Sequence, residues 1–433
     1  MRHRAFSLPL TAALAASSAL AWTTLGALAD TSPLPVDDDT IQASTVTFGG
    51  ADPLTTDRTI QHWSGETTNP LDGITYRYNM VGVDPATDGA ATIGVDIIPL
   101  DVTVDGVAFN GSERVAGLLA SPLFNTTNFS FTRAITKPDG TKWYRPAPSS
   151  PFPLSDGNSG QLLDAQMRAQ FNKVHPDSSY HLLLDTPVVY DPETIDVSQE
   201  HGATMVSPVG VLAAAVDLTW FQTRVQNLIE KLHLDPTRLA VFVSKDVMLY
   251  KDHDPTHCCV MGGHGAGSPT SSGSGPVSGN GNQPVQTFLW SAWISPGFWG
   301  PRAWINKDIS GFTHEFTEWA NDPFNNNTVQ PWKADNARQY GCMDLLETAD
   351  PLVGVGFSTG QNTFDPANLP NGAPNPFVEG KFHIQDEAFL PWFMHIGPVN
   401  DMTQPSQFTP NGRYTFMGDF SPFEWFQRPA DTC

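Results

Sequence analysis

Short runs of alternating apolar and polar residues, separated by glycine, asparagine, aspartate and proline, fill the chain from residue 43 to about residue 136. Such alternation is typical of strands with one buried face, and the clearest runs are 74–83, 91–101 and 102–109. The Asp105-Gly106 pair within the last run has the sequence of a hairpin turn. The pattern therefore predicts a β-rich N-terminal module over residues 43–155.

The pattern changes after residue 156, where helical and strand-like periods follow one another. The predicted elements are a helix at 161–173, a strand at 180–190, a helix at 212–232, a buried strand at 239–250 and a strand at 286–294. The segment 262–284 is rich in glycine and serine, and we expect a loop there because it is too polar to pack. We therefore expect an α+β domain over residues 156–433.

A further helix is predicted at 308–323, and its two faces differ sharply. Counting about 100° per residue from His314, Glu318 falls at about 40° and Glu315 at about 100°. The opposite side of the same helix carries only apolar residues: Ile309, Phe312, Phe316, Trp319 and Ala320. One face is therefore suited to a core, while the other presents an imidazole and two carboxylates.

The first 29 residues have the pattern of a secretory signal peptide. Arg2 and Arg4 precede an apolar run, and Ala27-Leu28-Ala29 is a small-residue cleavage site. The run is too short and too weakly apolar for a membrane span, and no later segment is long and apolar enough either. We expect an exported protein, extracellular or periplasmic, with no membrane partner and with an exposed Pro- and Asp-rich tail at residues 30–42 after cleavage.

The chain is globular in composition and strongly acidic. It contains 40% hydrophobic residues, with 26 Phe and 12 Trp, which is enough for a large core. Its 23 Lys and Arg against 45 Asp and Glu give a formal net charge of −22. This charge argues against nucleic acid as a partner and is compatible with bound cations.

The four cysteines are Cys258, Cys259, Cys342 and Cys433. An even number in an exported protein predicts disulfides. Because a bridge between sequence neighbours is strained, we expect Cys258 and Cys259 to pair separately with Cys342 and Cys433. The sequence does not fix which pairs with which.

His314-Glu315-x-x-Glu318 is close to the H-E-x-x-H helix of zinc metallopeptidases, with glutamate in place of the second histidine. Imidazole and carboxylate are both zinc ligands. We expect Glu347 as the third ligand, and Asp350 behind it as a hydrogen-bond acceptor for His314. The expected cofactor is Zn²⁺, with Ca²⁺ or Mn²⁺ as alternatives because a second carboxylate ligand adds negative charge. The competing interpretation is a surface helix whose charged face meets water.

These motifs resemble those of zincin-fold metallopeptidases of the gluzincin kind. The resemblance implies that His314 and Glu347 bind zinc, that Glu315 is the general base and that Asp350 supports the ligands. Glu318 stands where that family has histidine, and the spacing from Glu347 to Asp350 is one residue shorter than usual.

From about residue 210 to the end, the chain also resembles a group of secreted bacterial proteins. The shared motifs are a Cys-Cys…Gly-x-His segment at 258–264, an H-E-x-x-E-W-x-x-D-P helix at 314–323, an L-E-x-x-D-P segment at 346–351 and an F-L-P-W-F segment at 389–393. The implied fold is a β-rich N-terminal module followed by a zincin-like α+β domain with an H-E-x-x-E active-site helix.

The implied activity is zinc-dependent hydrolysis of a polypeptide substrate by metal-activated water, with Glu315 as general base. Such a mechanism also needs a group that stabilises the oxyanion. Our catalytic candidate for this role is His383, and further candidates are His395, Tyr340, His264 and His257. The alternative function is an extracellular binding or surface protein whose zincin-like domain holds a structural cation or none.

Overall fold

A computed structural model of the chain describes most of its length between residues 58 and 394. The described residues are 58–68, 73–127, 160–171, 173, 178–207, 210–267, 284–299, 305–333, 341–369, 371–394 and 414–416, together with the backbone alone of 22–24, 29–30, 128, 133–136, 142–145 and 159. Apart from the backbone of 22–24 and 29–30, the predicted signal peptide and tail lie outside the described residues.

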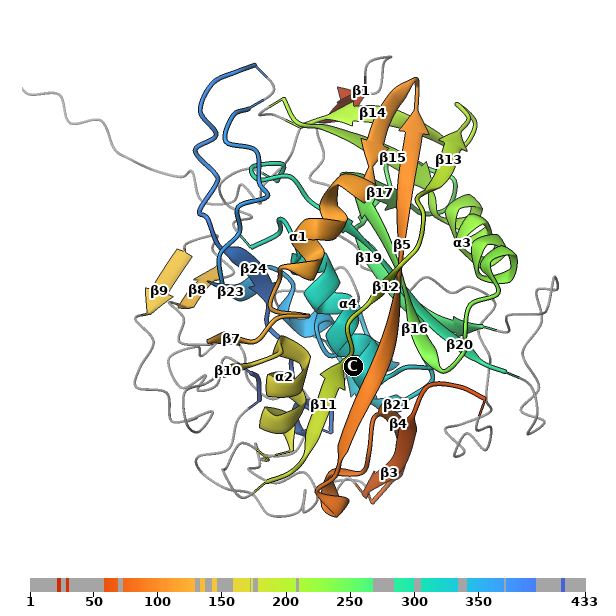
Figure 1. The fold of residues 1–433 in the computed structure, drawn as a ribbon, viewed down its shortest axis with the longest axis vertical. Coiled ribbons are helices and arrows are strands. Elements are labelled where there is room, and N and C mark those ends of the chain that lie inside the picture. The colour runs from red at the N-terminus through yellow and green to blue at the C-terminus, as the bar shows by residue number, and fades with distance from the viewer. Residues whose placement is uncertain are drawn as a thin grey trace, which may run out of the picture.

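An eight-stranded sheet forms the centre of the molecule (Figure 1). Its strands are β5 (Ala90–Val104), β6 (Val107–Asn110), β11 (His181–Leu184), β12 (Val188–Val189), β13 (Glu193–Val197), β16 (Arg238–Lys245), β19 (Gly262–Gly267) and β20 (Gln286–Trp293). The order across the sheet is β11-β5-β16-β20-β19, and β6, β12 and β13 pair with the long strand β5. Neighbouring strands from β11 to β20 are parallel, whereas β19 at the edge is antiparallel to β20.

A second, six-stranded sheet has the order β18-β17-β15-β14-β1-β2. Its strands are β1 (Trp22–Thr24), β2 (Ala29–Asp30), β14 (Gly202–Val206), β15 (Leu212–Asp217), β17 (Val247–Tyr250) and β18 (Cys258–Val260). The chain passes from β16 to β17 at Asp246, which has a φ of 51°. The buried Asp246 carboxylate accepts hydrogen bonds of 2.7 Å from Ser295 N and Ser295 Oγ. The predicted strand 239–250 is therefore two strands in two sheets.

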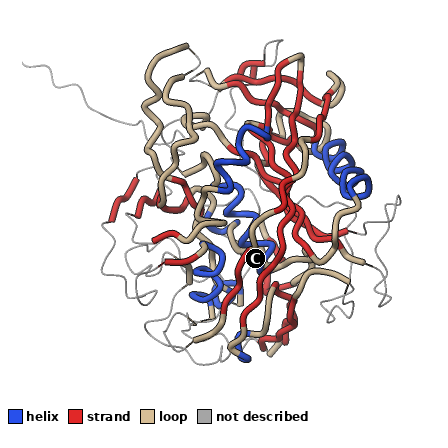
Figure 2. Tube along the Cα trace, viewed as in Figure 1, coloured by secondary structure: helices blue, strands red, loops and turns tan. Residues whose placement is uncertain are grey.

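Smaller sheets and the helices complete the fold (Figure 2). Three sheets have two strands each: β3 (His62–Thr68) with β4 (Thr75–Val81), β7 (Thr127–Asn128) with β10 (Ser159–Gly160), and β21 (Thr328–Trp332) with β22 (Met343–Leu345). A four-stranded sheet has the order β24-β23-β8-β9. Its strands are β8 (Arg133–Thr136), β9 (Lys142–Arg145), β23 (Val355–Thr359) and β24 (Phe382–Gln385). The helices are α1 (Val115–Leu119), α2 (Leu162–Gln170), α3 (Leu218–Leu232), α4 (Ser310–Asn321) and α5 (Leu390–Phe393), with short 3₁₀ turns at Pro85–Thr87, Gly111–Arg114 and Asp350–Leu352.

The central sheet has a hydrophobic core on each face, because successive side chains of a strand point to opposite faces. On β16, Leu239 and Val241 join the core that also contains the apolar residues of α2 and α4. Ala240 and Phe242 join the other core, together with the buried residues of α3. α4 and α3 therefore pack on opposite faces of the same sheet (Figure 1).

The mixed α+β class expected from the sequence is confirmed, with strands more abundant than helices. The helix at 161–173 is confirmed as α2, and the Asp105-Gly106 turn joins β5 to β6 as expected. β5 lies within the predicted β-rich module, and its partners β11 and β16 lie within the predicted domain at 156–433. Both segments therefore contribute to one sheet.

Two expected elements are wrong in their limits. The segment 212–217 is strand β15, and helix α3 begins only at Leu218 because the Asp217 carboxylate caps it by accepting from Trp220 N at 2.9 Å. The expected loop 262–284 begins with strand β19, whose backbone pairs with β20 despite its glycines. The rest of that segment, up to residue 283, lies outside the described residues. None of the helices in the described part of the chain has the length and apolar character that a membrane span requires.

We predict that Phe316→Ala lowers the free energy of unfolding by about 3–5 kcal/mol, because its fully buried ring packs edge-on against Phe124 and Trp319. The measurement is chemical denaturation followed by circular dichroism. Asn227→Ala, on the exposed side of α3, is the control and should change this free energy by less than about 0.5 kcal/mol. Equal effects of the two substitutions would contradict the assignment of Phe316 to the core.

Candidate metal centre

Helix α4 is buried on both of its faces. Its apolar residues belong to the core beneath it, as the helical pattern predicts. On the other face, His314, Glu315 and Glu318 are only 1–2% exposed. The alternative of a surface helix whose charges meet water is therefore excluded.

The helix ends at Asn321 because the next residue caps a loop. The Asp322 carboxylate accepts hydrogen bonds from Asn326 N at 2.9 Å and Asn327 N at 3.0 Å. Burial raises the pKa of Asp322 to about 7, although these hydrogen bonds act to lower it. Asp322, at the end of the predicted helix, therefore stabilises the loop that follows.

Two glycines allow α4 to approach the edge of the central sheet closely. A Cβ atom on Gly311 of the helix would lie 2.5 Å from Ser291 Oγ on β20. A Cβ atom on Gly262 of β19 would overlap Glu315 Oε1. The Glu315 side chain therefore lies directly against the backbone of the edge strand.

His314 is held between two carboxylates and an amide. Its Nε2 atom lies 3.0 Å from Glu318 Oε2 and 3.4 Å from Asp350 Oδ1. The second oxygen of Glu318, Oε1, accepts from the backbone N–H groups of Ala349 at 3.1 Å and Asp350 at 3.2 Å. These bonds fix the orientation of the Glu318 carboxylate, so that Oε2 faces His314.

Gln385 sets the position of the ring hydrogen of His314. Its Nε2 atom lies 2.7 Å from His314 Nδ1 and donates to the carbonyl oxygen of Ala349 at 2.8 Å. Because an amide nitrogen only donates, Nδ1 accepts in this arrangement, and the ring hydrogen is on Nε2. Gln385 lies on β24, which runs beside α4.

His264 of strand β19 meets the carboxylates from the other side. Its Nδ1 atom lies 3.4 Å from Glu315 Oε2 and 3.8 Å from Glu318 Oε2. Its Nε2 atom lies 3.9 Å from Glu347 Oε2. His264 is fully buried, so the centre is closed by the edge strand.

Glu347 faces this group without a hydrogen bond to either carboxylate oxygen from any described residue. It is 1% exposed, and burial raises its pKa well above the ordinary value. The negative charges of Glu318 and Asp350 raise that pKa further. A carboxylate in this position is stabilised by any positive charge placed among its neighbours.

The ligand atoms form two groups, each within 4.8 Å: His314, Glu318 and Asp350 in the first, and His264, Glu315 and Glu318 in the second. Among the expected ligands, His314 and Glu318 thus lie together, and Asp350 lies in the place expected for Glu347. Glu347 belongs to neither group, and its Oε2 atom lies 3.9 Å from His264 Nε2.

His383, expected to stabilise an oxyanion, belongs to a different buried group. Its Nδ1 atom lies 2.5 Å from Asp308 Oδ2, and its Nε2 atom lies 3.3 Å from Glu379 Oε2. Burial lowers the pKa of His383, but the charge of Asp308 and the hydrogen bonds raise it by more, so that it exceeds the ordinary value. These contacts join β24 to the segment that precedes α4.

The structure describes two of the other four oxyanion candidates, His257 and His264. His257 is exposed and pairs with Asp252 at 3.0 Å. Tyr340 and His395 lie outside the described residues. Of the two candidates that the structure describes, His264 lies beside Glu315.

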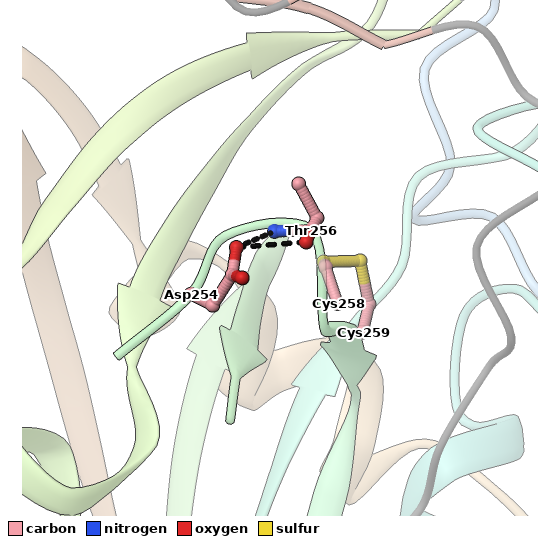
Figure 3. Close-up of a disulfide and its surroundings, with 4 residues drawn as sticks. All are labelled: Asp254, Thr256, Cys258 and Cys259. Atoms are coloured by element: carbon pink, nitrogen blue, oxygen red, sulfur yellow. Dashed lines mark hydrogen bonds between the residues drawn. A yellow bond between two sulfur atoms is a disulfide. The ribbon is translucent and has the colours of Figure 1, made fainter. Parts of the chain in front are cut away.

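The expected separate pairing of Cys258 and Cys259 is wrong, because these two neighbours are joined to each other by a disulfide (Figure 3). Their Cα atoms lie 3.1 Å apart, and both residues are fully buried in β18. The preceding turn is closed by the Asp254 carboxylate, which accepts from Thr256 N at 2.9 Å and Thr256 Oγ1 at 2.7 Å (Figure 3). Cys342 is also disulfide-bonded, and Cys433 lies outside the described residues.

Two residues of the centre were not identified as part of it from the sequence. His264 was only one of several oxyanion candidates, although the Gly-x-His segment after the cysteine pair marked its position. Gln385 follows no motif, since its role depends on the pairing of β24 beside α4.

No protein-family model, no curated protein and no solved structure matches the chain. The contacts of these side chains are therefore the basis for assigning a function.

We predict that Gly262→Ala lowers the free energy of unfolding by about 1–3 kcal/mol, because the added methyl group displaces the Glu315 carboxylate. Chemical denaturation is the measurement. Gly267→Ala on the same strand is the matched control, since its methyl group meets only the flexible end of Gln226 at 3.2 Å. A Gly262→Ala protein as stable as this control would show that the strand does not press on Glu315.

A second prediction concerns Glu387, a buried acid whose carboxylate accepts a hydrogen bond from Thr317 of α4. Burial raises its pKa to about 8 from an ordinary 4.5. The folded chain therefore binds the proton more tightly than the unfolded chain, and stability is lost as the pH rises between these two values. Glu387→Gln should make this decline shallower by up to about 1.4 kcal/mol per pH unit.

The measurement is the free energy of unfolding at several values between about pH 5 and pH 8. Glu66→Gln, which removes an exposed acid, is the control and should leave the slope unchanged. An unaltered slope in Glu387→Gln would disprove the assignment of the proton to this side chain.

Proposed function

We propose that this protein is a metal-dependent hydrolase that cleaves peptide bonds outside the cytoplasm. The observation that carries the proposal is the buried group of His314, Glu318 and Asp350, whose ligand atoms lie within 4.8 Å of one another. Glu315 follows His314 directly in α4 and brings a further carboxylate to the same buried space. An imidazole and two carboxylates around one point are a donor set for a divalent cation.

The chemistry of these donors favours Zn²⁺ or Mn²⁺ over Ca²⁺. Ca²⁺ binds six to eight oxygen ligands, whereas His314 offers a nitrogen. Asp350 takes the third ligand position, for which the sequence indicated Glu347. Glu318 is well suited to the second position because the N–H groups of Ala349 and Asp350 hold its Oε1 atom and leave Oε2 directed at His314.

His314 must present the lone pair of Nε2 to the cation. Its hydrogen then resides on Nδ1, and the Gln385 amide turns its oxygen toward that hydrogen, giving up its bond to the Ala349 carbonyl. Gln385 therefore acts as a positioning residue, which stabilises either tautomer of the ring through one amide rotation.

A divalent cation held by His314, Glu318 and Asp350 would supply an acidified water molecule and a Lewis acid for a substrate carbonyl. Glu315 accepts the proton of that water and passes it to the leaving amine. Close contact with the backbone of Gly262 keeps this carboxylate in one place.

The order of elements supports the zincin-like arrangement suggested by the resemblance. Helix α3, buried strand β16, strands β19 and β20, and helix α4 follow one another in the sequence. α4 packs on the sheet edge formed by β19 and β20. An exported location is supported by the signal-peptide pattern and by the disulfide in β18.

A non-catalytic protein with a structural cation is the second candidate function. The observation in its favour is the depth of the centre: His264, His314, Glu315, Glu318 and Glu347 are all at most 2% exposed. In this case the cation would tie α4 to β19 and would not meet a substrate.

The test compares wild type with Glu315→Gln, using bound metal by mass spectrometry and hydrolysis of fluorescently labelled casein. We expect bound Zn²⁺ or Mn²⁺ in wild type, hydrolysis that a chelator abolishes, and at least about 100-fold slower hydrolysis by Glu315→Gln. Glu387→Gln, which removes another buried acid beside α4, is the matched control and should remain active.

Wild-type protein without bound metal would refute the site. Full activity of Glu315→Gln would refute the mechanism. Bound metal in a wild-type protein that does not cleave peptide bonds would support the structural cation.

A further inference from the structure

The two groups of ligand atoms share one residue, Glu318. Its Oε2 atom lies 3.0 Å from His314 Nε2 in the first group and 3.8 Å from His264 Nδ1 in the second. Its Oε1 atom is occupied by two backbone N–H groups. A single carboxylate oxygen is therefore directed at both imidazoles at once.

We propose that the centre holds two divalent transition-metal ions bridged by Glu318, an inference that rests on the function proposed above. His314 and Asp350 complete the ligands of one ion, and His264 and Glu315 complete those of the other. Each ion then has one imidazole nitrogen, one carboxylate of its own and a share of Glu318.

The environment of Glu347 is an independent observation that points to a second bound ion. Both of its oxygens lack a hydrogen bond from any described residue, and its side chain is 1% exposed. Its Oε2 atom is 3.9 Å from Nε2 of His264, the residue whose Nδ1 faces Glu315 and Glu318. A single ion held by His314, Glu318 and Asp350 leaves the buried Glu347 carboxylate without a hydrogen bond from any described residue.

The charges of the six side chains also favour two ions over one. Four carboxylates carry four negative charges, and two divalent cations balance them with both imidazoles neutral. One cation leaves two negative charges in a buried space, where like charges repel each other far more strongly than in water. Burial of such uncompensated charge opposes folding.

This arrangement gives a chemical reason for glutamate at the position where an H-E-x-x-H helix has histidine. A neutral imidazole nitrogen has one lone pair and binds one ion, whereas a carboxylate oxygen can bridge two. Glu315 holds the second ion through Oε2, the atom near His264, and keeps Oε1 for the proton that the proposed function assigns to it. Paired ions of this kind stabilise both the attacking and the leaving atom of a hydrolysis.

The experiment measures metal per chain in the whole purified protein, stripped with a chelator and reloaded with ZnCl₂ or MnCl₂. Elemental analysis and native mass spectrometry should give two ions in wild type and in Glu387→Gln. His264→Ala should give one ion, retained on His314. With Mn²⁺, wild type should show the electron paramagnetic resonance spectrum of a coupled pair, and His264→Ala the six-line spectrum of an isolated ion.

One ion in wild type would overturn the two-ion centre and leave the proposed hydrolase standing. No bound ion would overturn both. Because the wild-type count decides the question by itself, the result holds even where the His264→Ala chain fails to fold. Two ions retained by a folded His264→Ala protein would also overturn the assignment, since His264 would then hold neither ion.

Discussion

The structure depends on the burial of four carboxylates and two imidazoles between helix α4 and the edge strand β19. Each of these groups is favoured by water and would oppose folding in an apolar interior unless it is paired. Contacts of 3.0–3.9 Å between described residues join the carboxylates to the two imidazoles. Burial of apolar side chains in the large cores on both faces of the sheet offsets the free-energy cost of enclosing these polar groups.

Helix α4 contributes both to the apolar core and to the buried charged centre. Its apolar stripe is part of the core on one face of the sheet, while its polar face forms the centre. The same helical turn places Phe316 in the core and Glu315 against Gly262. Any shift of the helix that improves packing would therefore change the distances between the charged groups. This coupling explains why both faces are enclosed so tightly.

The sequence predicted the parts of this arrangement that depend on local periodicity. The two faces of the helix at 308–323 and the hairpin at Asp105-Gly106 follow from spacing alone. The strand β19 escaped prediction because its glycines read as a loop, and its pairing with β20 is decided by tertiary contacts. The places of His264 and Gln385 in the centre were not predicted for a related reason. The register of strand pairing decides which side chains of β19 and β24 face α4. The predicted cysteine pairing was wrong because it assumed that strain rules out a disulfide between sequence neighbours. The structure joins Cys258 to Cys259.

Gln385 reaches His314 across 71 residues of sequence, and Ala349 N reaches Glu318 across 31. The centre is thus assembled from β19, α4, the segment around Glu347 and β24, which are distant along the chain. Contacts of this range close late in folding, because each requires a long loop to be ordered first. A chain that is still partly unfolded lacks the centre altogether. Because its ligands come from remote segments, the centre depends on the completed fold and cannot be supplied by any one segment alone.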